Sequence, residues 1–243
     1  VGASGPAGSG IAEVLVDSFA GANDDAKLAA ALAYAAAQTY KPTIRFSNRA
    51  YSFTQPITWF SGMRLVGSAT GHTDQVRSGT PIPNQINLNI GSSNGWLQQP
   101  NGNTFGVYIA GLAFQGNSTT RWIQPNGSAV LWTSVIENCS WNLFKSVFGS
   151  SSQQFLVTAT SISGWMNTNN SYDQAWCFGG SDSSINVSAR SLIDSPTDPA
   201  GGPGTVITGG ASGQNTHMKL VSFSKSNIGG LYITGERVRP LEI

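Results

Sequence analysis

The chain has 243 residues, of which 10% are charged and 40% are hydrophobic, and its formal net charge is +1 at pH 7. Soluble proteins usually contain about 25% charged residues. Because no basic block or stripe is present, the composition argues against a protein that binds nucleic acid through its phosphates. It also argues against disorder, which requires high charge or few apolar residues. The length allows one large domain with a substantial core.

No apolar run is long enough to span a bilayer, and no metal-binding spacing is present, so we expect no membrane insertion, no metal and no cofactor. Cys139 and Cys177 lie far apart in the sequence. Buried free thiols are the default expectation for both, and a disulfide between them is left open. The chain begins at Val1 rather than Met, which indicates a processed product or a fragment, so the lack of a signal peptide does not bear on location.

The first residues, 1–12, are rich in glycine and small side chains. Gly2, Gly5 and Gly8 follow a three-residue period, and Pro6 lies between them. Only glycine fits at the axis of a collagen triple helix, so this segment is predicted to be either a Gly/Ser linker or the end of a Gly-X-Y stalk. A stalk of that kind would join three chains.

One amphipathic helix is predicted after this segment. Asn23 or Asp24 is a suitable N-cap, and the carboxylates of the first turn favour the positive end of the helix dipole. Leu28, Leu32 and Ala35 or Ala36 recur at helical spacing, so one apolar stripe must be buried.

Short strands are predicted for the rest of the chain, recurring at roughly 20 to 30 residues, the range that is typical of solenoids. Their expected cores are Thr43–Phe46, Tyr51–Trp59, Met63–Val66, Gln85–Ile90, Val107–Ile109, Leu112–Phe114, Val135–Asn142, Phe155–Val157, Ile162–Trp165, Ile185–Val187, Met218–Leu220 and Leu231–Ile233. His72–Pro83 is predicted to be a loop, and an irregular excursion is expected near residues 194–215.

These units favour a parallel β-helix, because a single coil cannot bury its own apolar face and stacked coils can. The alternative is an antiparallel sandwich or jelly roll, for which turns every 8–12 residues are typical. In the β-helix interpretation, residues 13–62 form a cap and residues 63–243 form the coils. Asparagines that follow strands are expected to stack their amides along the axis: Asn117, Asn138 or Asn142, Asn169 and Asn227.

The segment Asp17–Phe53 combines an Asp, a Gly21-Ala22 step, the acidic pair Asp24-Asp25, an Ala-rich helix and a strand-turn-Tyr51 pattern. It resembles the N-terminal cap of pectate-lyase-like right-handed β-helices, the family that includes phage tailspikes and tail-fibre depolymerases. The turn before the acidic pair is shorter than in that family. The resemblance implies an all-β, right-handed parallel β-helix with a capping helix, and assembly as a homotrimer in a phage tail.

Catalytic motifs are absent from the sequence. Carboxylates are the weak candidates for sugar cleavage, because a glycoside hydrolase needs two at a defined separation. Asp17, Asp24 and Asp25 are assigned to the cap, which leaves a loop cluster and one strand residue. The candidates are Asp173, Asp182, Asp194 and Asp198 in the cluster, with Arg190 near Asp194 for a lyase, and Glu137 beside Lys145. Solvated loop carboxylates are the simpler interpretation, and the two histidines, His72 and His217, are interpreted as surface residues.

Tryptophan offers a large rigid face that suits sugar stacking and subunit interfaces equally well. Trp122 with Arg121, and Trp176 with Tyr172, are the predicted glycan-binding residues. Trp132, Trp141 and Trp165 are instead expected in the core or at coil corners.

The function favoured by the sequence is a virion module of a phage tail fibre or tailspike that attaches to host cell-surface glycan, outside the cell. Its expected partners are two further copies of the chain, the polysaccharide and other tail proteins. A polysaccharide depolymerase of the same fold, lyase or hydrolase, is the alternative, and a structural spacer of the tail is the third hypothesis.

Overall fold

The structure is a computed structural model of the 243-residue chain. It describes backbone and side chains for residues 13–68, 85–90, 95–117, 119–126, 129–142, 144, 146–148 and 155–164. Beyond these it describes the backbone of the strands at 165–167, 176–181, 184–190, 205–209, 216–219, 223–224, 231–234 and 238–242. The predicted stalk or linker and the predicted loop His72–Pro83 lie outside the described residues.

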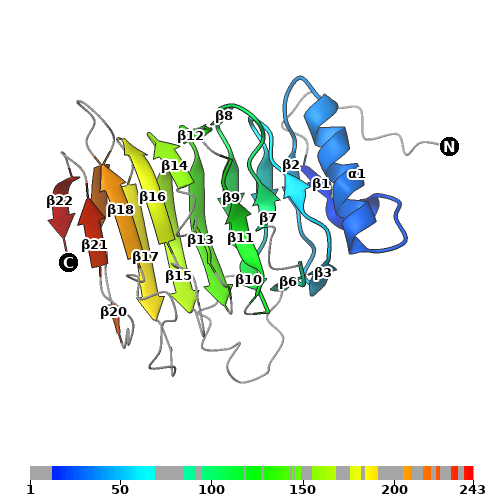
Figure 1. The fold of residues 1–243 in the computed structure, drawn as a ribbon. Helices are drawn as coiled ribbons and strands as arrows, with labels where there is room; N and C mark the ends of the chain where they lie inside the picture. The colour runs from blue at the N-terminus through cyan, green and yellow to red at the C-terminus, as the bar shows by residue number, and fades with distance from the viewer. Residues whose placement is uncertain are drawn as a thin grey trace.

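The predicted helix is present as α1 (Asp24–Ala37) and lies at one end of the molecule, beside the first strands (Figure 1). Asn23 is its N-cap, since the side-chain oxygen accepts a hydrogen bond from the N–H of Ala26 at 2.9 Å. The buried stripe consists of Leu28, Ala31, Leu32 and Ala35, whereas Ala36 is exposed. The stripe packs into the same core as the strands, so the helix covers one end of that core.

The strands form three parallel sheets. Sheet A has the order β1 (Glu13–Leu15), β2 (Thr43–Arg45), β5 (Arg64–Val66), β9 (Tyr108–Ala110), β13 (Val135–Asn142), β15 (Ser161–Asn167), β17 (Ser184–Arg190), β19 (Thr216–Lys219) and β22 (Val238–Glu242), with β3 (Tyr51–Phe53), β6 (Gln85–Leu88), β10 (Ala113–Gln115) and β20 (Phe223–Ser224) paired alongside. Sheet B contains β4 (Ile57–Thr58), β7 (Gly95–Gln98) and β11 (Arg121–Gln124). Sheet C has the order β8 (Thr104–Phe105), β12 (Val130–Trp132), β14 (Phe155–Thr158), β16 (Trp176–Ser181), β18 (Thr205–Gly209) and β21 (Leu231–Thr234).

Successive strands of a sheet come from successive stretches of the chain, and Figure 1 shows them side by side from α1 to β22. Every strand pairing within the described part is parallel, including β2 with β5, β5 with β9 and β9 with β13. The antiparallel sandwich or jelly roll is therefore wrong for these strands. The strand-rich, parallel architecture with one N-terminal helix is confirmed.

The core of sheet A is a ladder of aliphatic side chains in direct register. Ile44 pairs with Leu65, Leu65 with Ile109, Ile109 with Ile136 and Ile136 with Ile162, and all five are fully buried. Each inward position is thus covered by its neighbours on the next strands, which gives the burial that a single strand pair lacks.

A second part of the core is aromatic and joins the three sheets. It contains Phe46, Tyr51, Phe53, Trp59, Trp96, Phe114, Trp122, Trp141, Phe148 and Phe155, with ring centroids between 5.1 and 6.5 Å apart. Edge-on and offset contacts of this kind add to the burial of apolar area.

The corner that follows sheet C is a column of left-handed backbone. Gly62, Gly106, Thr133 and Ala159 have φ of 79°, 65°, 45° and 48°. Their backbones are hydrogen-bonded in order, because Gly62 N–H donates to Phe105 O, Gly106 N–H to Trp132 O and Thr133 N–H to Thr158 O. After Gly106, Thr133 and Ala159 the chain passes from sheet C into sheet A. These three residues are of different types, so the turn is repeated as a backbone conformation and not as a sequence motif.

Two observations bear on the predicted excursion and on the predicted cap. Residues 205–209 form β18, which pairs with β16 and β21, so the predicted excursion at 194–215 contains a strand of sheet C. The remainder of that stretch lies outside the described residues. In addition, β1 comes before the helix in the chain and pairs with β2, which in turn pairs with β5. The predicted cap (13–62) and the predicted coils (63–243) therefore contribute strands to the same sheet.

Candidate functional site

Asp17 and Asp24, assigned to the cap from the sequence, are both bound by Arg49. The guanidinium donates to Asp17 Oδ2 at 3.1 Å and to Asp24 Oδ1 at 2.7 Å, while its carbon lies 3.8 Å from the centroid of the Tyr51 ring. Tyr51 Oη also donates to Asp17 Oδ2 at 2.8 Å. Asp24 accepts in addition from the N–H of Ser52 at 2.9 Å, so this cluster ties the start of the chain to α1 and β3.

The electrostatics of this pair differ from those of a catalytic acid. The hydrogen bonds from Arg49 hold the pKa of Asp17 well below its ordinary value. For Asp24, partial burial acts to raise the pKa, but hydrogen bonds from Arg49 and Ser52 outweigh it and lower the pKa overall. A general acid needs a raised pKa, so these two carboxylates act as structural anions.

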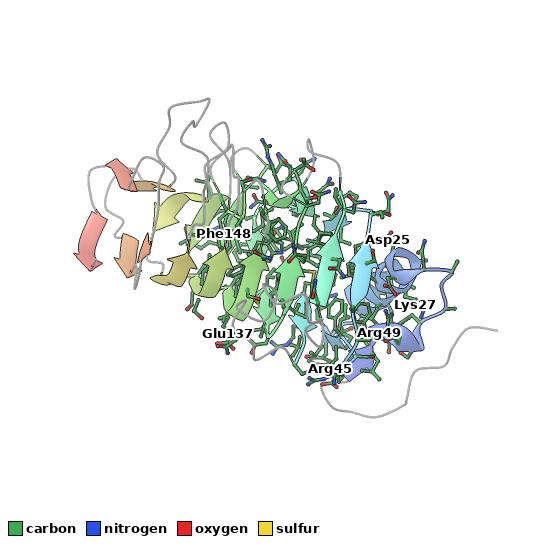
Figure 2. The ribbon with its side chains drawn as sticks, turned by 90° about the horizontal axis from the view of Figure 1, so that it is seen from below. Asp25, Lys27, Arg45, Arg49, Glu137 and Phe148 are labelled. Atoms are coloured by element: carbon green, nitrogen blue, oxygen red, sulfur yellow. The ribbon has the colours of Figure 1, made fainter. Side chains whose placement is uncertain are left out.

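Asp25 and Lys27 complete the cap. Asp25 accepts from the backbone N–H of Thr54 at 3.1 Å and of Gln55 at 3.2 Å, and Lys27 lies 3.4 Å from Asp17. Figure 2 shows Asp25, Lys27 and Arg49 gathered at the helix end of the molecule. The cap carboxylates therefore hold α1 on the strands, as the sequence predicted.

Glu137 lies on the outer face of sheet A, opposite to the buried Phe148 (Figure 2). Tyr108 Oη donates to its carboxylate at 2.6 Å, and the Arg64 guanidinium lies 4.7 Å from the Tyr108 ring centroid. The hydrogen bond to Glu137, together with partial burial, raises the pKa of Tyr108. Lys145, the partner predicted for Glu137, lies outside the described residues.

A second carboxylate is missing beside Glu137 among the described side chains. The acids described besides Glu137 are the three cap aspartates and Glu13, which is bound to Arg45 on β2. Glu13 lies on β1, four strands from β13 in sheet A, which corresponds to about 19 Å at the usual strand spacing. Glycosidases place their two carboxyls roughly 5 to 9.5 Å apart, so Glu13 and Glu137 do not form such a pair. Asp173, Asp182, Asp194 and Asp198 lie outside the described residues.

A β-bulge follows Glu137. The register between β13 and β15 shifts between Ile136 and Cys139, and Asn138 between them is exposed with φ 51°. Cys139 is a buried free thiol, and burial raises its pKa to about 12. This matches the default expectation for Cys139, which is not in a disulfide with Cys177, and it shows that the thiol is chemically inert at neutral pH.

The predicted glycan site at Trp122 is wrong. Trp122 is fully buried, with its ring centroid 5.2 Å from that of Phe114 and 5.1 Å from that of Trp141. The reason is that β11 packs both of its faces, since Ile123 is fully buried as well. Arg121 is half-buried on the same strand. Tyr172 and the side chain of Trp176 lie outside the described residues.

The exposed aromatic pair that the structure does show comes from sheet C. Phe105 is 49% exposed on β8 and is in register with the half-buried Trp132 on β12. Their rings are stacked, with centroids 6.1 Å apart and planes at 24°. Trp132 was expected in the core or at a corner. It is instead on the outer face directly before the corner, whereas Trp141 is in the core as predicted.

Pairs of side-chain amides stack between neighbouring coils. Asn117 donates to Asn89 at 2.7 Å, Asn126 to Asn101 at 2.6 Å and Asn142 to Gln115 at 2.6 Å, across separations of 25 to 28 residues. The predicted stacking is thus confirmed for Asn117 and Asn142. Asn138 adopts the left-handed corner conformation instead, and Asn169 and Asn227 lie outside the described residues.

One of these pairs has a signal in the sequence that the strand pattern alone does not reveal. Gln-Pro-Asn-Gly occurs at 99–102 and again at 124–127. Gln99 Nε2 donates to Ala129 O at 2.9 Å, and Gln99 Oε1 accepts from the N–H of Asn126 at 3.1 Å. The two copies are thus hydrogen-bonded to one another before sheet C begins. Phe105 follows the first copy by three residues, and Trp132 follows the second copy by five.

The described outer face of sheet C, called the C wall here, consists of Asn103 and Phe105 at β8, Val130 and Trp132 on β12 and Leu156 on β14. None of these side chains is charged. Between Arg77 and Glu137 the sequence contains one charged residue, Arg121, and that residue lies in sheet B. The C wall therefore offers aromatic rings, aliphatic groups and amides without ionic partners.

The described residues contain neither a metal-binding cluster nor a membrane-spanning helix. No group of three or more His, Cys, Asp or Glu side chains gathers among the described residues. The helices described there include none that is long and apolar enough to cross a membrane. Comparison of the chain with known protein families, with curated proteins and with solved structures finds no match.

Proposed function

We propose that the chain is a right-handed parallel β-helix, closed at its N-terminal end by α1, that serves as an attachment module of a phage tail fibre or tailspike and binds host cell-surface glycan. Three features support the solenoid. Strands of sheets A, B and C follow one another in β5 to β8 and again in β9 to β12, and strands of sheets A and C keep returning in parallel pairing up to β22. The corners recur as a hydrogen-bonded column, and parallel strands joined by crossovers are right-handed in about 98% of known cases.

The uncharged C wall is the observation that carries the attachment function. Sugar hydroxyls are neutral donors and acceptors, and the faces of sugar rings are weakly polar, so they are complementary to amides and aromatic rings rather than to ion pairs. Apart from Arg121 in sheet B, the charged groups described in the structure lie in the cap and along sheet A, where several are paired.

Attachment is preferred to cleavage because the described carboxylates are separated or held as structural anions. Asp17 and Asp24 share Arg49, and Glu137 is bound by Tyr108 without a second described acid nearby. The proposed homotrimer and the location in a virion follow from the resemblance of the cap and from the Gly-X-Y period at residues 1–12.

The test combines binding with product analysis. The purified chain is applied to an array of bacterial surface polysaccharides, and each polysaccharide that it binds is then incubated with it and assayed for new reducing ends and for unsaturated sugars. Binding without product is expected. If the wild type and the Glu137→Gln variant both release product, the result would support a depolymerase with a site outside the described residues. If the chain binds nothing on the array, the result would favour the structural spacer.

A further inference from the structure

We infer that the open face of the Phe105 ring on the C wall is the stacking site for an uncharged saccharide. This inference rests on the proposed attachment function and adds the residue that makes the contact and the chemical class of the ligand.

The two sides of the Phe105 ring have different neighbours. β8 is the edge strand of sheet C, and its partner β12 places Trp132 against one face of Phe105. On the other side, toward the helix end, the neighbouring backbone is that of Ser61 and Gly62. Phe105 N–H donates to Ser61 Oγ at 3.1 Å, and Gly62 N–H donates to Phe105 O at 2.7 Å. Both residues are small, and Phe105 remains 49% exposed. The stem of Lys41 lies against Gly62, but its ammonium donates to Ala36 O and Gln38 O at 2.6 Å and is thus bound to the backbone after α1.

The second step concerns the polar groups beside the ring. Asn103 is exposed on the same face as Phe105, because side chains alternate along a strand and Thr104 between them is buried. Its Oδ1 accepts from the N–H of Val130 at 3.0 Å, which fixes the amide beside the ring pair. A rigid aromatic face with an oriented amide is an arrangement that binds a sugar ring by stacking and by hydrogen bonds to its hydroxyls.

The third step selects the class of saccharide. A uronate, sialate or phosphate group is normally met by Arg or Lys, and the described residues of the C wall contain neither. An uncharged saccharide has no such group, so the lack of a cation on the C wall does not weaken its binding.

The fourth step distinguishes a saccharide from another copy of the chain. A stable interface between proteins buries about 800 Å² on each partner around an apolar core. The large hydrophobic residues exposed in the described part are Leu15, Tyr40 and Phe105, which come from β1, the segment after α1, and β8. Phe105 is thus the one exposed large hydrophobic residue among the described residues of the C wall, which is too little for such a core on this wall. The proposed homotrimer would be joined elsewhere, whereas one sugar ring needs one aromatic face.

The experiment uses the full chain and an array of uncharged and anionic oligosaccharides, followed by calorimetric titration with the uncharged oligosaccharide that gives the strongest array signal. Phe105→Ala is expected to weaken the Kd about tenfold or more, and Phe105→Leu should weaken it to a similar extent because the ring is lost. Phe105→Tyr keeps the ring and should stay within about twofold of the wild type. Leu15→Ala is the matched control, since it removes an exposed apolar side chain from sheet A and should leave the Kd unchanged.

Circular dichroism and urea unfolding of each variant separate loss of the site from loss of the fold. The affinity for an uncharged saccharide is expected to change little between about 50 and 500 mM salt, because no ionic contact is screened. Saccharide binding by the wild type that persists in Phe105→Ala overturns this inference and leaves the proposed function standing. Binding confined to anionic saccharides with strong salt dependence overturns the ligand class, and absence of any saccharide binding overturns both proposals.

Discussion

The outer faces of sheet A and of the C wall are built on the same parallel ladder but differ in their chemistry. On sheet A the exposed side chains form a linked row, in which Arg45 binds Glu13, Arg64 donates to Thr43 and stacks on Tyr108, and Tyr108 binds Glu137. The C wall carries the stacked rings of Phe105 and Trp132 and the amide of Asn103, and none of its described side chains is charged. The charged side chains of sheet A thus pair with one another, whereas the described residues of the C wall are uncharged, and it is the uncharged face that fits the ligand proposed above.

The largest expected effect separates the interior from the C wall. Trp122→Ala removes a fully buried indole that contacts Phe114, Trp141 and Phe148, and should lower the free energy of unfolding by about 3 to 5 kcal/mol. Trp132→Ala removes a half-buried indole on the wall and should cost about 1 to 2 kcal/mol. Urea unfolding measures both. Equal losses for the two variants would contradict the assignment of Trp122 to the interior, and Trp122→Phe provides a milder variant that is expected to fold.

The next effect concerns the charged side, at the cap. Arg49→Lys removes the planar guanidinium that binds Asp17 and Asp24 together, and should lower the free energy of unfolding by about 2 kcal/mol at neutral pH. Both carboxylates have lowered pKa values in the folded chain. Their contribution is therefore present above the unfolded pKa of about 4 and is lost as the pH falls below it, because the unfolded state then binds more protons.

Unfolding of the wild type and of Arg49→Lys by urea at about pH 7 and at about pH 3 tests this sign. The difference between the two proteins should shrink in acid. A difference that stays constant or grows would show that the ion pairs do not hold the cap.

A smaller effect is expected on sheet A itself. Glu137→Gln replaces a charged acceptor of the Tyr108 hydroxyl by a neutral one, which should change the free energy of unfolding by less than about 1 kcal/mol at this half-buried surface position. Because the hydrogen bond to Glu137 raises the pKa of Tyr108, the substitution should lower that pKa. The difference between ultraviolet titrations of a protein with Tyr108 and of the same protein carrying Tyr108→Phe gives the pKa of this one tyrosine. Saccharide affinity should be unchanged, and a loss of affinity would show that the charged face takes part in binding.

The smallest effect concerns the corner between the two faces. Thr133 has φ 45°, a left-handed conformation that glycine adopts without strain. Thr133→Gly should therefore raise the free energy of unfolding by about 0.5 kcal/mol, the relief of strain being partly offset by the entropy of glycine. Ser161→Gly, in an extended strand of the same coil, is the control and should be destabilising. Thermal unfolding that ranks the two variants in the reverse order would contradict the corner assignment.

Much of the fold follows from local patterns in the sequence. The capping residue Asn23 and the stripe of Leu28 and Leu32 predicted α1, and alternation around Ile86 and Ile109 predicted strands of sheet A. Strands β7 and β11 were missed because Trp96-Leu97 and Trp122-Ile123 are buried on both faces and show no alternation.

The same physical reason explains the misplaced site. In a strand that is buried on both faces, an aromatic residue is buried even when its neighbours in the sequence are polar. The position of Arg121 next to Trp122 therefore wrongly indicated that Trp122 is exposed. On β12, by contrast, the burial of Leu131 between two half-exposed neighbours follows the period-two pattern that turns Trp132 outward. The stacking of Phe105 on Trp132 depends on register across coils, which single-sequence periodicity does not determine.

The corner column has a consequence for the length of the molecule. Gly106, Thr133 and Ala159 turn the chain by backbone conformation alone, and each corner is bonded only to the coils directly beside it. In the proposed β-helix, a stretch from one corner to the next is therefore a unit with matching ends. Duplicating residues 107–133 would then lengthen sheets A and C by one strand spacing, about 4.8 Å, without any new kind of junction, so the length of the proposed module would change in whole steps.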